Sequence, residues 1–153
     1  MKKKIAFIIL SILVVSFSKK NDEKIFTSKK ISIRMYKDYL NPNSKILHEK
    51  VIGKNVIITI DTIFNSYSFI YTNQDNKKEG IKLNYVRDLF DNLNLASPLI
   101  NRLYVMKDNT DNYYELNDYI GLYKSLAFKW VNPNTKADTL DMVYYMEAIS
   151  PKN

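Results

Sequence analysis

The chain has 153 residues, of which 46% are hydrophobic and 25% charged, and its formal net charge is +7. This length and apolar content suffice for one hydrophobic core and are too small for two. The chain has no cysteine and a single histidine, which excludes disulfides and argues against thiolate or multi-histidine metal sites. Its lysines are interleaved with acidic residues, so we expect a solvated mixed-charge surface and no nucleic-acid partner.

The first eighteen residues have the order of a bacterial export signal. Three lysines at positions 2–4 precede an apolar run over residues 5–17. A helix of that length spans about 20 Å, which is shorter than the ~30 Å hydrocarbon core of a bilayer. We therefore predict a signal peptide over 1–18 that is cleaved after Ser18. The mature chain would be periplasmic, part of the cell envelope or secreted, with no permanent transmembrane anchor and a charge of +4, because residues 1–18 hold three lysines and no acid.

The end of this segment carries a resemblance. The string Val14-Val15-Ser16-Phe17-Ser18 and the polar residues 19–23 resemble the lipobox and export linker of lipoproteins from the Bacteroidota. In that family a cysteine follows the small residue and carries the lipid, whereas Phe17 stands at that position here. The resemblance thus implies a lipoprotein lineage without the thioether-linked anchor. The alternative is an ordinary secreted protein in which Phe17 ends the apolar run.

Beyond a predicted polar linker over 19–29, residues 30–153 form one expected β-rich domain in which apolar and polar residues alternate with period two. The alternating stretches are 31–36, 56–61, 66–71, 81–86, 102–106, 126–131 and 140–149. Turn-forming residues separate them at 41–43, 53–55, 73–80, 108–112 and 132–135. We predict an all-β antiparallel meander of about seven to eight strands, which forms a small barrel or a sandwich.

One region departs from this alternation. A short helix is expected near 87–94, ended by Ser97-Pro98 because the residue before proline is pushed out of the helical region. The alternative is an α+β fold with a full helix over 81–94, since apolar residues there also share one helical face. A second helix over 117–124 is conceivable, although Gly121 weakens it.

No recognisable catalytic motif is present, and we predict a non-enzymatic protein with no catalytic residue, cofactor or metal ion. His48 lies in an expected edge strand or loop. The turn 108–112 is rich in oxygen donors but lacks the glycine and distal glutamate of an EF-hand loop, so it is interpreted as a hairpin turn. Asp61, Asp141 and Glu147 lie in strand-like runs and are the carboxylates that a hydrolase would need.

Aromatic residues are the remaining positive feature, with twelve Tyr, seven Phe and one Trp. Phe69, Phe128, Trp130 and Tyr144 are expected to point inward, where they either line a ligand pocket or fill a solid interior. Tyrosines, of which several would face outward, could support contacts with another protein; they are Tyr36, Tyr39, Tyr104, Tyr113, Tyr114, Tyr119 and Tyr145.

Three functions remain as hypotheses. The first is an exported cell-envelope protein that acts as an interaction or assembly module with another envelope protein. The second is a small β-barrel that binds an apolar or glycan ligand. The third is a carboxylate-dependent hydrolase. A pocket inside the barrel would favour the second hypothesis over the first.

Overall fold

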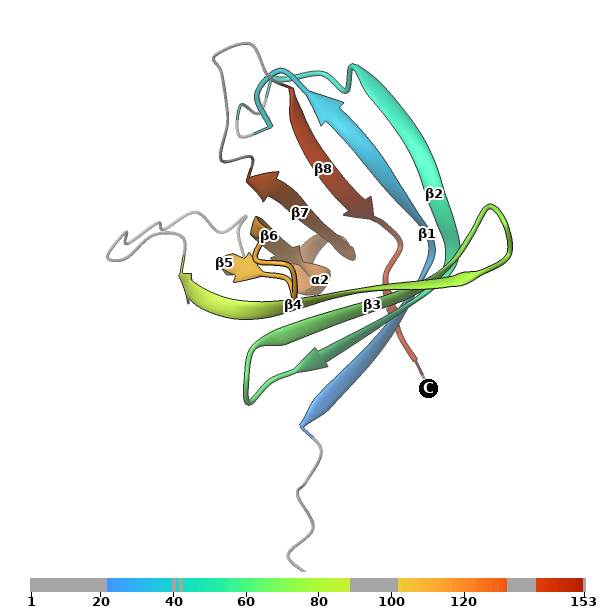
Figure 1. Ribbon diagram of the computed structural model, residues 1–153, viewed down its shortest axis with the longest axis vertical. Helices are drawn as coiled ribbons and strands as arrows, with labels where there is room; N and C mark the ends of the chain where they lie inside the picture. The colour runs from blue at the N-terminus through green and yellow to red at the C-terminus, as the bar shows by residue number, and fades with distance from the viewer. Residues whose placement is uncertain (1–21, 40, 42, 89–101, 132–139, 153) are drawn as a thin grey trace, which may run out of the picture.

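The computed structural model describes residues 22–39, 41, 43–88, 102–131 and 140–152 (Figure 1). Within these residues the chain forms nine strands and one single-turn helix. They are β1 (Glu23–Tyr36), β2 (His48–Asp61), β3 (Ser66–Asn73), β4 (Lys78–Asp88), β5 (Arg102–Lys107), β6 (Tyr113–Tyr119), α2 (Ile120–Tyr123), β7 (Ser125–Val131), β8 (Asp141–Met146) and β9 (Ser150–Pro151). No helix in this part of the chain is long and apolar enough to cross a bilayer.

The strands form a closed antiparallel barrel. Strands β1 to β8 pair in chain order, and β1 also pairs with β8, so the sheet closes on itself with eight strands. The short β9 adds to the outer edge of β1 at Phe26 and Thr27. The prediction of an all-β antiparallel meander is therefore confirmed, and ring closure decides in favour of the barrel.

Strand β1 forms the seam of this barrel. Its whole length pairs with β2, from Glu23↔Asp61 to Met35↔His48. On its other edge, only residues 31–36 pair with β8, and the first half meets only β9. The first half of β1 therefore has no full strand neighbour on that edge, which leaves room for side chains there.

Aromatic side chains fill the barrel at mid-height. The rings of Phe69 on β3 and Phe128 on β7 stack with centroids 5.0 Å apart, although these strands belong to opposite walls. Tyr144 stacks on the other side of Phe128 at 4.7 Å. Phe69 and Phe128 are fully buried and therefore part of the core, and Tyr144 and Trp130 pack against it.

The segment after β1 folds back over the outer surface of the barrel. The backbone N–H of Tyr39 donates to Asp141 Oδ2 at 2.8 Å, and its hydroxyl accepts from Asn117 Nδ2 at 3.0 Å. Asn117 and Ser32 are buried although they face away from the interior. Burial around the Tyr39 hydroxyl raises its pKa. A loop thus gives this part of the barrel wall a second, polar layer.

Three expectations about helices differ from the structure in the residues that it describes. Residues 78–88 form β4, which excludes a helix over 81–94 and places Arg87 and Asp88 of the expected helix 87–94 in a strand; residues 89–94 lie outside the described residues. The buried Leu83 pairs with Tyr67 across β3 and β4, so period two prevails over the helical interpretation. The second helix is limited to Ile120–Tyr123, because residues 117–119 belong to β6.

Three boundaries also differ from expectation. β1 begins at Glu23, so residues 23–29 are strand and not linker, with Phe26 and Ser28 opposite the buried Ile58 and Val56. The expected turn 53–55 is a bulge inside β2, where the pairing with β3 shifts register. Strand β6 lay in no predicted alternating stretch, because Asp118 occupies one of its inward positions.

A candidate ligand pocket at the end of the barrel

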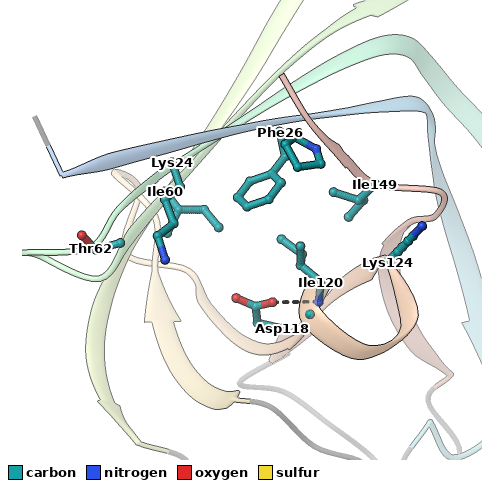
Figure 2. Close-up of a pocket in the computed structure, with 10 residues that line it drawn as sticks. Lys24, Phe26, Ile60, Thr62, Asp118, Ile120, Lys124 and Ile149 are labelled. Atoms are coloured by element: carbon teal, nitrogen blue, oxygen red, sulfur yellow. Dashed lines mark hydrogen bonds between the residues drawn. The ribbon is translucent and has the colours of Figure 1, made fainter. Parts of the chain in front are cut away.

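A pocket of about 580 Å³ opens at the end of the barrel where β1 begins (Figure 2). We call it the end pocket. It draws on both chain ends and on the β6–β7 connection. Its lining residues are Lys24, Phe26, Ile60, Thr62, Asp118, Ile120, Gly121, Lys124, Ile149 and Pro151.

The barrel seam explains why the pocket lies there. The first half of β1 has only the two-residue β9 on its outer edge, and α2 follows β6 at the same end. Lys124 ends α2 in the left-handed conformation, and its carbonyl accepts a hydrogen bond from Ile149 N at 2.8 Å. This bond ties the segment before β9 to α2. Side chains, not strand pairing, therefore close the wall between β1 and α2.

The end pocket has an apolar part and a polar part of similar extent, and Phe26 and three isoleucines contribute to the apolar part. Ile60 and Ile149 are 6% and 2% exposed and belong to the core cluster, while Phe26 and Ile120 are partly buried and pack against it. In Figure 2 the Phe26 ring and the Ile120 side chain point into the same space from opposite sides. This surface suits an apolar group, because apolar contact is favourable wherever water is displaced.

Asp118 places a carboxylate at the base of this apolar space. Its side chain is at an inward position of β6, and the residue is only 8% exposed. The Tyr67 hydroxyl donates to Oδ2 at 2.7 Å, and the backbone N–H of Ile120 donates to Oδ1 at 3.0 Å. A carboxylate oxygen accepts more than one hydrogen bond, so capacity remains for a further donor. Asp118 is thus a fixed acceptor that faces the pocket (Figure 2).

Two lysines stand at the rim. Lys24 comes from the start of β1 and Lys124 from the end of α2, so they flank the pocket from different elements (Figure 2). The pocket therefore combines an apolar body, one anchored acceptor and a cationic rim. Within the described residues, no three His, Cys, Asp or Glu side chains come together in a way that could hold a metal ion.

The aromatics singled out from the sequence lie elsewhere. Phe69 and Phe128 belong to the core cluster, Trp130 and Tyr144 pack against it, and none of the four lines the end pocket. His48 begins β2 and is exposed.

The three carboxylates considered for hydrolysis each form hydrogen bonds or an ion pair with residues outside the pocket. Asp61 accepts hydrogen bonds from the backbone N–H groups of the β2–β3 turn. Asp141 accepts from Tyr39 N, and Glu147 forms an ion pair with Lys30 at 3.0 Å. None of the three lines the end pocket.

The sequence does not identify the pocket residues, although it carries one signal of them. Tyr114, Leu116 and Asp118 alternate in β6, and all three are buried. An acidic residue in phase with buried apolar residues is unusual, because a buried charge is costly unless it is hydrogen-bonded. That pattern indicates that Asp118 is an inward acidic residue and a candidate for a binding site. Lys24, Ile149 and Pro151 carry no such signal, since only the folding of both chain ends brings them to β6.

The fold and the site define a small antiparallel β-barrel with stacked aromatic rings in its interior and a pocket at one end. No protein-family model, curated protein or solved structure matches this chain.

Proposed function

We propose that this protein is an exported, non-enzymatic binding protein that holds a small amphipathic ligand in the end pocket. The observation that carries the proposal is the anchored carboxylate of Asp118 among the apolar side chains of Phe26 and Ile120. Such a combination of many apolar contacts with a few placed polar groups is typical of small-molecule sites.

The lining also indicates the chemical class of the ligand. Phe26 and three isoleucines offer contacts for an apolar body, and two lysines, Thr62 and Asp118 offer partners for polar groups, so the lining suits an amphipathic ligand. A hydroxyl or ammonium group on that body would donate to Asp118, the acceptor at the base of the pocket. Export is supported by the lysines and apolar run of residues 1–18 and by the lipobox-like end of that segment.

Binding of a small ligand is the stronger of the two non-enzymatic hypotheses. The interaction-module hypothesis relied on outward tyrosines, but Tyr114 is buried in the core and the Tyr39 hydroxyl is bonded to Asn117. Tyr36 packs against Tyr39 with ring centroids 5.2 Å apart, and Tyr145 lies beneath the Arg34 guanidinium at 3.6 Å. These side chains already take part in contacts within the chain.

A steric block of the pocket tests the proposal. The probe is 8-anilinonaphthalene-1-sulfonate, an amphipathic dye whose fluorescence rises in apolar sites. Ile120→Trp fills part of the pocket, and we expect its affinity for the dye to fall by about tenfold, equivalent to the loss of one large apolar contact.

Leu47→Trp is the matched control. Leu47 is 58% exposed and does not line the end pocket, so its replacement should leave the dye titration unchanged. Circular dichroism checks that both variants are folded. Equal dye binding by the two variants would contradict the proposed ligand site.

A further inference from the structure

The turn between β2 and β3 exposes two large apolar side chains at the rim of the end pocket. We call residues 62–65 the apolar tip. Ile63 is 61% exposed and Phe64 70%, which are the highest values among the large hydrophobic residues that the structure describes. Thr62, the first residue of the tip, lines the end pocket. The tip and the pocket therefore lie at the same end of the barrel.

The backbone of the tip is held in place, so the exposure does not arise from a loose loop. Asp61 Oδ1 accepts hydrogen bonds from Ile63 N at 2.9 Å and from Phe64 N at 3.1 Å. Asn65 then takes a left-handed conformation, with φ of 48°, and completes the turn. The local bonds satisfy the backbone while both apolar side chains remain outside.

Two of the other described turns, which join β3 to β4 and β5 to β6, are polar. The β3–β4 turn presents Gln74, Asp75 and Asn76, and the β5–β6 turn presents residues 109–111, which are Asn, Thr and Asp. In an up-and-down barrel successive turns alternate between the two ends, so both polar turns lie at the end opposite the apolar tip. Turns are normally built from polar residues. Ile63 and Phe64 are more exposed than Ile46 and Leu47, the apolar pair at the opposite end, and an exposed apolar pair held on an ordered turn points to a partner for that end.

The segment that precedes β1 indicates the nature of this partner. Thr62 donates to the Asp22 carbonyl from its backbone N–H at 3.1 Å and from its hydroxyl at 2.7 Å, so the tip is tied to the point where the chain enters β1. The apolar run of residues 5–17 ends only four residues before Asp22. Even fully extended, that spacing covers less than about 20 Å. Before cleavage after Ser18, when the apolar run lies in a bilayer as an export segment does, the apolar tip is within reach of the lipid surface.

We propose that the end of the barrel that carries the apolar tip docks on a lipid bilayer, with Ile63 and Phe64 inserted among the headgroups and the first acyl carbons. Tyr123 on α2 is 55% exposed at the same end and adds an amphipathic ring of the kind that favours membrane interfaces. Lys24 and Lys124 at the pocket rim complement anionic lipid headgroups. This docking rests on the proposed export of the protein, but it does not depend on the proposed ligand of the end pocket.

The cysteine-free chain allows a single-site test. An environment-sensitive nitrobenzoxadiazole label is attached to the full chain through Ile63→Cys or, as the control, through Asp75→Cys at the opposite end. Vesicles contain phosphatidylcholine and phosphatidylglycerol in equal parts. We expect vesicles to raise and blue-shift the emission of the label at position 63 and to leave the label at position 75 unchanged. In the labelled Ile63→Cys chain, Phe64→Ser should remove most of this response, because loss of one phenyl ring lowers insertion by about tenfold.

Three outcomes would overturn the docking proposal. The first is no response at position 63, and the second is an equal response at positions 63 and 75. The third is a blue shift that needs no vesicles and grows with protein concentration, which would show that a second copy of the chain covers the tip. The dye titration of the end pocket contains no lipid, so failure of one proposal is distinguishable from failure of the other.

Discussion

At the scale of single residues, Asp108 shows how one carboxylate shapes a turn. Its Oδ1 accepts from Thr110 N, Thr110 Oγ1 and Asn112 N, and its Oδ2 accepts from Asn112 Nδ2 and Tyr114 OH. Desolvation raises the pKa of Asp108, but the hydrogen bonds from Thr110 and Asn112 outweigh it and lower the pKa to about 2. The interpretation of residues 108–112 as a hairpin turn agrees with these bonds, because the oxygens that a cation would need already accept internal donors.

This lowered pKa predicts a pH-dependent contribution to stability. Because the pKa in the folded state lies below the ordinary 3.8, the contribution is present above pH 3.8 and is lost as the pH falls towards 2. We expect Asp108→Asn to lower the free energy of unfolding at neutral pH by about 1 kcal/mol, a value reduced for partial solvation of the carboxylate. Urea denaturation of both proteins from pH 7 to pH 2 checks this. A difference that stays constant over the whole range would refute the assignment.

Asp118 illustrates the opposite setting for a carboxylate. It has the same side chain as Asp108 but lies inside the barrel, where Tyr67 and the start of α2 hold its two oxygens. Sequence alone describes both as acidic residues next to strands. Their difference comes from the direction of the side chain in β6, which is decided by the pairing of Asp118 with Leu126 on β7.

At the scale of secondary-structure elements, β2 contains a glycine that resembles a turn residue in the sequence. Gly53 was expected in a turn, yet it lies inside β2, where it pairs with Ile31 and Asn73. The ring of Tyr71 lies directly over the Gly53 Cα, and a Cβ added at Gly53 would overlap that ring. Tyr71 is 6% exposed and its hydroxyl donates to Glu79 at 2.9 Å, so the ring has little freedom to move. The absence of a side chain at Gly53 thus makes space for a buried aromatic ring.

Two glycine substitutions separate this close contact from general strand propensity. Gly53→Ala forces the Tyr71 ring to shift, and we expect a loss of about 1–3 kcal/mol in the free energy of unfolding, as for other overpacked sites. Gly80→Ala is the matched control, since its Cβ would meet Phe69 O at 3.4 Å, an ordinary contact. It should change stability by less than about 1 kcal/mol. Guanidinium denaturation measures both, and equal effects would show that the Tyr71 contact is not the cause.

At the scale of the whole molecule, the stacked rings of Phe69 and Phe128 join opposite walls of the barrel. Strands β3 and β7 are four strands apart in either direction around the ring, so no backbone hydrogen bond connects them. Their rings nevertheless meet at 5.0 Å, and Tyr114 packs edge-on against Phe128 at 5.7 Å. The cross-section is closed by side chains, and the space for a ligand is displaced to the end of the barrel.

A double-mutant cycle measures this link between the two walls. We expect Phe69→Leu and Phe128→Leu to couple by about 0.5–1.5 kcal/mol, the usual range for an aromatic pair. Phe128→Leu combined with Phe64→Leu is the control cycle, because Phe64 is exposed on the apolar tip and its effect should be additive. Both cycles are measured by equilibrium unfolding. Full additivity of the Phe69 and Phe128 effects would show that the stacking does not tie β3 to β7.

Much of this architecture could be predicted from the sequence because a strand buried on one face repeats every two residues. The stretches 56–61, 66–71 and 126–131 alternate in this way, and each lies in a strand of the barrel. The prediction failed where this pattern was broken. Asp118 stands at an inward position in β6, Gly53 looks like a turn residue, and the polar start of β1 resembles a linker.

The sequence by itself thus determined the all-β class, the antiparallel order and the polar turns, since these follow from local periodicity and turn-forming residues. Only the tertiary structure decided that β1 closes the sheet against β8, because closure depends on register between strands that are distant in the chain. Closure also decided the candidate site. Lys24, Asp118 and Ile149 come from the beginning, the later part and the end of the chain, and they meet because the seam of the barrel leaves space that both chain ends border.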